Sequence, residues 1–501
     1  MRFFLVNMII CLAAYLVLIS NELTNTYDGM WQGSYYVGYP WVISIGRWFW
    51  PVVGKLRLNM SPEPFTSIIS LMMYVLGSCI VSYWFRLGYS WKSYALVLIS
   101  IIQPAVCVTL SYRYMSPTFA GSYLLSVLGA WVLSAEWRGR LIVSIILLTV
   151  SMGCYQATLG VTCLLILLYS VYLMQRESCT KKLLRFMGAS VLAIILACLL
   201  YKIIWDIVLK ICNINPSNYR GADSLSIYRI VTTFPESFVN TYKVYIKFLI
   251  ARVAKYNAYQ YSGAYKIGLL MYLIFTFILG GVRIAKKGFK GYLLYAFLIA
   301  LIPAAVNVSM ILAADTGSPM IQMIVPMTVS LPFLVCVVEF DQVKEVFSVA
   351  LTKYYQLFFV LLLCGNFLMI SIDQHVMLTS RQTTLAITNR IAEDIDYSQE
   401  PKEGYVFLGK PSDNPLFRKD ELWQYSNEYA QYGNFYIGTN GNRQSYYGLL
   451  RDAGLGIKLN MDDSYWHKLE EEEAIRNTPS FPNEGYIRAV DDVVVVKLSN
   501  W

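Results

Sequence analysis

The amino-acid sequence predicts an α-helical polytopic membrane protein with about eleven transmembrane helices and a small α/β C-terminal domain outside the membrane. Hydrophobic residues make up 56% of the 501 residues and charged residues only 15%, whereas typical soluble domains carry about 25% charged residues. Long apolar runs recur until about residue 373, and a helix needs about 20 apolar residues to cross a bilayer. A more polar segment follows.

The apolar runs define the expected spans in order. The first run, residues 3–20, follows a single arginine but has no small-residue cleavage site at its end, so we interpret it as a retained helix and not as a signal peptide. The expected spans are residues 3–20, 65–85, 93–111, 116–135, 140–154, 157–174, 187–209, 267–284, 291–312, 320–339 and 355–373.

Residues 140–174 are too long for one span and rather short for two. Basic residues flank them on both sides. Because basic residues collect in cytoplasmic loops, both ends belong inside and the run must cross the membrane twice. Its outer apex is then SMGCYQA, residues 151–157, where Gly153 allows a break. The flanking basic residues are Arg138, Arg140, Arg176, Lys181, Lys182 and Arg185.

The same rule orients the rest of the chain. Basic residues fall in the loops that this threading places inside, and the short outer loops hold few. We therefore expect a cytoplasmic N-terminus and an extracytoplasmic C-terminus. The domains are then residues 1–373, with large outer loops at about 21–64 and 210–266, and residues 374–501. The basic residues of the inner loops include Arg86, Lys92, Arg283, Lys286, Lys287, Lys290, Lys344 and Lys353.

The C-terminal region, residues 374–501, reads as a small α/β domain. Residues 380–395 have helical periodicity, and the runs GYVFLG (404–409), NFYIG (434–438) and DDVVVVKL (491–498) indicate strands. The segment LGKPSDN (408–414) lacks the spaced glycines and the Lys-Ser/Thr pair of a phosphate loop.

Composition excludes several other classes of function. Most of the ten cysteines lie in apolar runs, no Cys-x-x-Cys occurs and there are only two histidines. A disulfide scaffold and a His-rich zinc or iron site are therefore not expected, and no cofactor is indicated. The net charge of +9 follows from basic inner loops, so it does not require a nucleic-acid partner.

Two acids after the first span are the candidate catalytic residues. Asp28 lies in a loop rich in tyrosine and tryptophan, and Glu22 is closer to the end of the helix. A solvated loop acid would also fit this pattern. However, a carboxylate held near lipid and aromatic rings has a raised pKa, as a general base needs, and aromatic rings stack on sugars. We rank Asp28 first.

Cations and polar groups near the outer surface are candidate substrate ligands. Arg47, beside Trp48 in SIGRWFWP, and Arg113 in SYRYMSP each fit either an arginine that extends to the interface or a phosphate ligand. Tyr155 and Gln156 supply polar groups at the apex. The remaining candidate is Asp315, an outer acid that could bind a sugar. Asp206 and Lys202, one turn apart, are expected to pair locally.

These features together resemble a known family. The acid Asp28, the Gly-Arg-Trp segment at 46–48 and the SPEPF segment at 61–65 resemble those of the serotype-converting glucosyltransferases of O-antigen modification. SMGCYQATL (151–159) is similar to a segment of the same family. The resemblance covers about residues 1–375. That family often has two adjacent acids in the first loop, whereas Gly29 follows Asp28 here, so Glu22 stays open as the base.

The resemblance implies a GT-C-type membrane glycosyltransferase of the bacterial inner membrane. Its donor would be a polyprenyl-phosphate sugar, most often glucose, and its acceptor a surface glycan such as O-antigen on its lipid carrier. Expected partners are a small flippase and the enzyme that forms the polyprenyl-phosphate glucose donor. Arg47 or Arg113 would hold the phosphate that leaves.

Two other functions fit parts of the sequence. Another lipid-linked envelope transferase or polymerase would also have many spans and large outer loops. A polysaccharide flippase or transporter would place charges near the membrane centre and often shows inverted repeats. This chain has few charges within its spans and collects its polar features on one outer face, which favours chemistry at the interface.

Overall fold

The computed structural model describes residues 1–176, 180–224, 227–313, 317–396, 401–434, 440–460 and 462–500. Within these ranges, seven helices are long and apolar enough to cross a membrane, or eight if the bent pair α7–α8 is one span. The predicted count of eleven is therefore not confirmed. Three of the predicted spans form shorter apolar helical segments, which are Arg2–Ala14, Arg140–Cys154 and Ile321–Val337.

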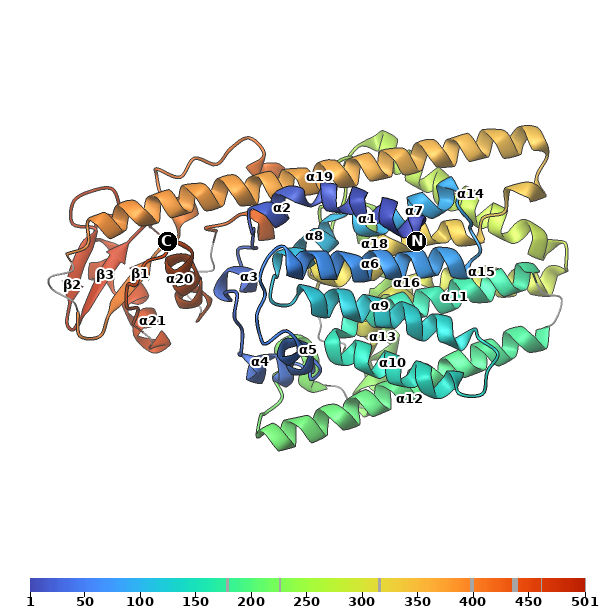
Figure 1. Ribbon diagram of the computed structural model, residues 1–501, viewed down its shortest axis with the longest axis horizontal. Coiled ribbons are helices and arrows are strands. Elements are labelled where there is room, and N and C mark those ends of the chain that lie inside the picture. Colours follow the sequence, from blue (N-terminus) through green and yellow to red (C-terminus); the bar gives the residue numbers. More distant parts are fainter. Residues whose placement is uncertain are drawn as a thin grey trace.

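The predicted spans all lie in one helical bundle whose long helices run along the long axis of the molecule (Figure 1). Its centre is α11, whose most apolar stretch is 78% buried, whereas the corresponding stretch of α12 is 28% buried. Apolar side chains exposed on α12 fit contact with lipid. The helices are α1 (Arg2–Ala14), α2 (Leu16–Ser20), α6 (Phe65–Trp84), α7 (Trp91–Ile101), α8 (Pro104–Ser111), α9 (Ser116–Leu133), α10 (Arg140–Cys154), α11 (Leu159–Arg176), α12 (Thr180–Cys212), α14 (Gly263–Ala285), α15 (Phe289–Ala300), α16 (Ile302–Val306), α17 (Val308–Leu312), α18 (Val325–Phe333) and α19 (Glu345–Glu393).

Short helices fill the predicted outer loops. The first loop carries α3 (Asp28–Trp31), α4 (Tyr39–Ser44) and α5 (Trp50–Leu56), and α3 lies between the bundle and the C-terminal region (Figure 1). The predicted middle loop contains the 3-10 helix η2 (Tyr219–Ser224) and the 23-residue helix α13 (Ile227–Leu249). These elements form the boundary at which the candidate site residues lie.

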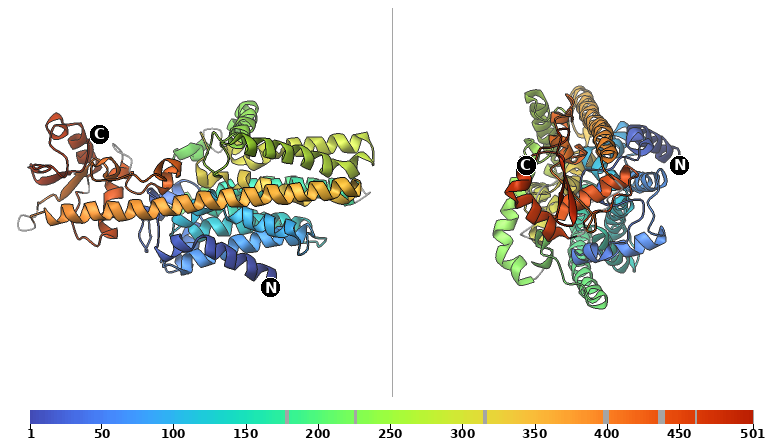
Figure 2. Two further views of the ribbon diagram at one scale, coloured as in Figure 1. Left: turned by 90° about the horizontal axis from the view of Figure 1, so that it is seen from above. Right: turned by 90° about the vertical axis from the view of Figure 1, so that its left-hand side faces the viewer.

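Helix α19 connects the two parts of the molecule. It has 49 residues and continues from the bundle into the C-terminal region (Figure 2). The predicted domain boundary between residues 373 and 374 falls inside this continuous helix. The division into domains therefore stays a prediction, and helix α19 continues across the predicted boundary.

The C-terminal region contains a small sheet with helices beside it. Strand β3 (Val493–Lys497) lies in the middle, parallel to β1 (Tyr405–Leu408) and antiparallel to β2 (Ile487–Val490). The strands predicted at 404–409 and 491–498 are thus confirmed. The strand predicted at 434–438 lies, except for Asn434, outside the described residues. The helices here are α20 (Asn440–Asp452), α21 (Asp463–Glu471) and α22 (Glu473–Arg476).

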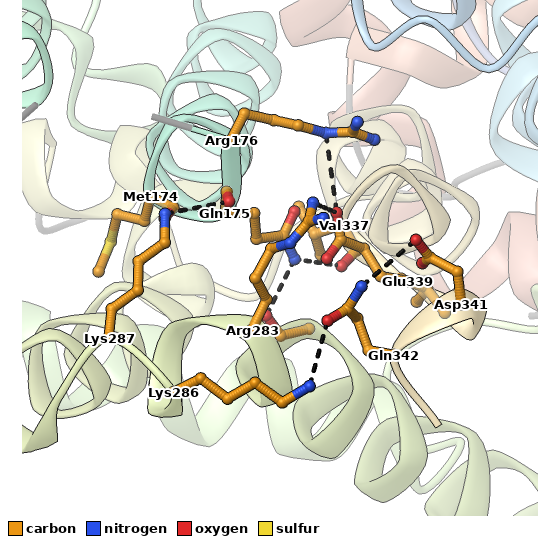
Figure 3. Close-up of polar contacts among 12 residues, drawn as sticks. Met174, Gln175, Arg176, Arg283, Lys286, Lys287, Val337, Glu339, Asp341 and Gln342 are labelled. Carbon is orange, nitrogen blue, oxygen red and sulfur yellow. Dashed lines mark hydrogen bonds and ion pairs between the residues drawn. The ribbon is translucent and has the colours of Figure 1, made fainter. Parts of the chain in front are cut away.

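Basic residues of the predicted inner loops gather at the end of the bundle away from the sheet (Figures 1 and 3). Arg283 donates to the buried carboxylate of Glu339 at 3.0 Å, and Arg176 lies 3.7 Å from the same oxygen. Lys287 donates to the backbone carbonyls at the end of α11, where the helix dipole favours a cation. Basic residues from separate predicted inner loops thus meet at this end of the bundle, and the orientation in the membrane stays a prediction.

A buried carboxylate ties α19 to the C-terminal region. Asp373 is fully buried and accepts hydrogen bonds from the backbone N–H of Asn427 at 2.8 Å, the Asn427 side chain at 3.0 Å and the Tyr429 hydroxyl at 2.6 Å. A buried donor without an acceptor is costly. Asp373 therefore fixes the segment around Asn427 against the bundle.

We expect Asp373→Ala to lower the stability by about 3 kcal/mol, because three donors lose a charged acceptor. Thermal unfolding in detergent and protease cleavage near Asn427 would measure the effect. Asp492→Ala is the matched control, since Asp492 is exposed and an exposed ion pair contributes about 0–1 kcal/mol. Equal effects of the two substitutions would contradict this role of Asp373.

Candidate active site

Asp28 lies on a tight turn that Asn25 holds. The Asn25 side-chain oxygen accepts hydrogen bonds from the backbone N–H groups of Tyr27 and Gly29, both at 3.0 Å, as in an Asx turn. A Cβ on Gly29 would come within 2.7 Å of the Ser111 carbonyl. Glycine after Asp28 therefore lets the turn approach the end of α8, and a second carboxylate at position 29 would not fit.

The C-terminal region also forms hydrogen bonds with this turn. The indole of Trp31 donates to the Ser445 hydroxyl at 2.9 Å, and Arg451 donates to the Met30 carbonyl at 2.7 Å. Met30 is fully buried and belongs to the hydrophobic core of the C-terminal region. A Cβ on Gly448 would lie 2.2 Å from the Met30 carbonyl. Helix α20 is thus part of the support of Asp28.

Arg47 lies on a loop that two polar side chains hold from the bundle. Gly46 has φ of +86°, and its carbonyl accepts from the Tyr201 hydroxyl at 3.0 Å. Gln156 donates to the Ile45 carbonyl at 2.8 Å and to the Tyr201 hydroxyl at 2.9 Å. Glycine tolerates this backbone conformation, and a Cβ at position 46 would collide with Tyr201.

The loop also packs against the break between α10 and α11. The Phe49 N–H donates to the Gly153 carbonyl at 3.0 Å, and the Trp50 indole donates to the Cys154 carbonyl. The ring of Trp48 covers Gly153 so closely that a Cβ there would lie 2.6 Å from it. The Gly-Arg-Trp segment and the SMGCYQA segment are therefore two halves of one structure.

This structure leaves the Arg47 guanidinium between two aromatic rings. It lies 5.0 Å from the centre of the Trp50 ring and 5.1 Å from that of Tyr155, a cation–π arrangement. Its buried Nε has no hydrogen-bond partner within the described part of the chain, and neither does the buried Tyr155 hydroxyl. An anion could take up both groups.

Asp28 and Arg47 act on each other electrostatically. Burial raises the pKa of Asp28 from 3.8 to about 6, although the positive charge of Arg47 opposes this shift. Burial penalises the ionised carboxylate, whereas a nearby cation favours it. At neutral pH the carboxylate is therefore largely ionised but basic enough to accept a proton.

An apolar groove of about 510 Å³ begins at Arg47 and Tyr155. Its walls include Met152, Leu159 and the side chains of Ile195 and Leu199 on the exposed face of α12. The groove thus reaches the exposed apolar face of α12. Lys202 and Arg220 also line it; Lys202 pairs with Asp206, as predicted, and Arg220 donates to the Ser318 carbonyl at 2.9 Å.

Arg113 and Glu22 are paired with each other instead. Their ion pair is 2.9 Å long, with Arg113 buried and Glu22 more than half exposed. Neither residue lines the groove. Asp315 lies outside the described residues. The structure therefore brings Arg47, Trp48, Tyr155 and Gln156 together, with Arg47, Tyr155 and Gln156 at the groove. Asp28 does not line the groove but lies within the electrostatic influence of Arg47, whereas Glu22 and Arg113 pair with each other.

The sequence reading did not single out Asn25, Tyr201 and Arg220. An asparagine three residues before an acid is an Asx-turn signal that could have identified Asn25. Tyr201 lies in the middle of an apolar run, and no sequence pattern indicates that it contacts Gly46. Among the described residues, no group of three or more His, Cys, Asp and Glu side chains could hold a metal ion.

We expect Gly153→Ala to lower stability by about 1–3 kcal/mol, because its new methyl group collides with the Trp48 ring. Gly188→Ala, in α12 with open space around it, should raise it by about 0.5–1 kcal/mol, since alanine favours a helix. Thermal unfolding in detergent tests both. A stabilising effect at both positions would contradict the close packing of Trp48 on Gly153.

The chain matches the family model of the glucosyl transferase GtrII over residues 19–361. No curated protein and no solved structure matches it. The match includes Asp28, the Arg47 loop and the break at Gly153, and it ends within α19, before the C-terminal sheet. This confirms the resemblance that the sequence motifs indicate: the chain belongs to the glucosyl transferase GtrII family.

Proposed function

We propose that this glucosyl transferase moves a glucosyl group from a polyprenyl-phosphate donor to a surface glycan such as O-antigen, on the outer face of the bacterial inner membrane. One observation carries the proposal. Arg47, whose Nε has no hydrogen-bond partner among the described residues, lies at an apolar groove that opens on the exposed face of α12, and its charge acts on the basic carboxylate of Asp28. The choice of glucose as the transferred sugar rests on the family match.

The groove suits a lipid-phosphate donor. Its walls of Met152, Leu159 and Leu199 offer an apolar surface to the first isoprene units. Arg47 at its head would bind the phosphate through charge-assisted hydrogen bonds. The sugar would then project from the phosphate toward Asp28. A soluble nucleotide-sugar donor would leave the apolar wall unused.

The chemistry needs one proton acceptor and one stabilised leaving group. An acceptor hydroxyl gives its proton to the Asp28 carboxylate while its oxygen attacks the anomeric carbon of the glucosyl group. The bond from that carbon to the phosphate oxygen breaks, and its electron pair leaves with polyprenyl phosphate. Arg47 stabilises the charge that develops there. A single displacement inverts the anomeric configuration.

Asp28 is preferred to Glu22 as the base because of their partners. Glu22 is more than half exposed, and its carboxylate is already engaged in an ion pair with Arg113. Asp28 has a raised pKa and lies within the electrostatic reach of Arg47. The outer location of the chemistry rests on the basic residues that gather at the opposite end of the bundle, as around Glu339 (Figure 3).

The other envelope functions have weaker support. A polymerase would transfer a glycan block, whereas the family model describes a glucosyl transferase. A flippase or transporter would not need a base beside an arginine. The family match also favours sugar transfer over transport.

We expect Asp28→Asn to lower the rate of transfer roughly 100- to 10,000-fold, because the general base is lost. The assay would follow release of polyprenyl phosphate from undecaprenyl-phosphate glucose with a lipid-linked glycan as acceptor. For the unsubstituted protein, the rate should rise with pH and level off above about 6, since only ionised Asp28 accepts a proton.

Glu22→Gln serves as the matched control and should retain most of the activity. Activity that survives Asp28→Asn but not Glu22→Gln would move the base to Glu22. A folded protein that uses no polyprenyl-phosphate hexose would contradict the donor.

A further inference from the structure

A second cavity, of about 870 Å³, lies between the bundle and the C-terminal region. Its walls come from the end of α8, from the segments around residues 251–255 and 319–322, and from residues 426–434 of the C-terminal region. The cavity is polar, unlike the donor groove. Its size is near the upper end of the range of about 300–1,000 Å³ for ligand pockets.

The cavity reaches the turn that carries Asp28. Tyr27, the residue before Asp28, lines it, and so does Tyr112. Tyr112 is buried and lies within the electrostatic influence of both Asp28 and Arg47. Residues 319–322 line this cavity while Met323 lines the donor groove, so one short segment separates the two spaces.

The charges on the cavity wall are largely compensated within the protein. Lys255 donates to the carbonyls of Gln424 at 2.6 Å and Ser426 at 2.7 Å, and the carboxylates of Asp373 and Glu428 act electrostatically on its charge. Lys410 pairs with Asp413 at 3.4 Å. Arg252 and Glu428 line the exposed rim and have opposite charges. The wall therefore carries no strong net attraction for an anion.

The wall also has groups that bind sugars. The amide of Gln322, whose nitrogen donates, among the described residues, only to the Met320 sulfur, and the exposed carboxylate of Glu428 offer hydrogen-bonding groups for sugar hydroxyls. The Tyr261 ring is 59% exposed and lies at the wall, where an apolar sugar face could stack on it. Apolar rings with convergent polar groups are the usual composition of a ligand site.

We propose that this cavity binds the acceptor, and that the acceptor is a neutral, hydroxyl-rich oligosaccharide segment that presents one hydroxyl to Asp28. This inference rests on the proposed glucosyl transfer and adds the class of the acceptor and its place of binding. Tyr261 and Glu428 are specificity-determining residues. The C-terminal region thus selects the acceptor in addition to supporting the Asp28 turn.

The test uses the full-length protein in detergent and the polysaccharide released by mild acid from the envelope of the bacterium that carries it, separated into neutral and acidic fractions. Calorimetric titration measures binding of each fraction without a donor, so the result does not depend on the donor's identity. We expect the neutral fraction to bind to the unsubstituted protein and to Asp28→Asn. The double variant Tyr261→Ala with Glu428→Ala should weaken binding about tenfold or more, the effect of about 1.4 kcal/mol.

A matched double variant, Tyr447→Ala with Glu484→Ala, changes an exposed tyrosine and an exposed acid that do not line the cavity, and it should bind like the unsubstituted protein. Preference for the acidic fraction, absence of binding, or equal binding by both double variants would overturn the inference. Failure of transfer from undecaprenyl-phosphate glucose while the neutral glycan still binds at the cavity would instead overturn the proposed donor.

Discussion

The site depends on the packing of the Gly-Arg-Trp loop against the break between α10 and α11. The Trp48 ring occupies the space above Gly153, and Gln156 and Tyr201 hold the backbone at Gly46. These contacts require two glycines and a helix that ends early. These contacts fix the Arg47 guanidinium between aromatic rings, and its Nε has no hydrogen-bond partner in the part of the chain that the structure describes. The shortness of α10 is thus a requirement of the site.

A second constraint comes from the far end of the sequence. Met30 is buried in the core of the C-terminal region, and Arg451 holds its carbonyl. The turn that carries Asp28 is therefore supported by the bundle through Asn25 and by α20. This arrangement joins the turn of Asp28 to two segments that are distant in sequence, the end of α8 and helix α20. The position of the base relative to Arg47 thus depends on how the C-terminal region is seated on the bundle, which the continuous helix α19 helps to fix.

Sequence reasoning identified the class, the family and the two motifs that meet at the site. Apolar run length and basic loops are local patterns, so they could be read directly, as could the strands at 405–408 and 493–497. The end of α10 at Cys154 was also predicted. The break between α1 and α2 at Tyr15, inside the predicted span 3–20, could not be read, because the contacts of Tyr15 are with the distant residues Ile101 and Gln103. The pairing of Arg113 with Glu22 was missed for the same reason: the two residues are 91 positions apart. The cavity between the bundle and the C-terminal region could not be predicted from the sequence, because residues from separate loops form its walls.

The most direct test is whether Arg47 lowers the pKa of Asp28 in addition to binding phosphate. The pH dependence of transfer should be compared between the unsubstituted protein and Arg47→Gln. The positive charge of Arg47 lowers the pKa of Asp28, so its removal should raise that pKa and move the midpoint of the rate profile from about 6 to a higher pH. An unchanged midpoint in an active Arg47→Gln protein would contradict the claim that these two residues form one catalytic unit.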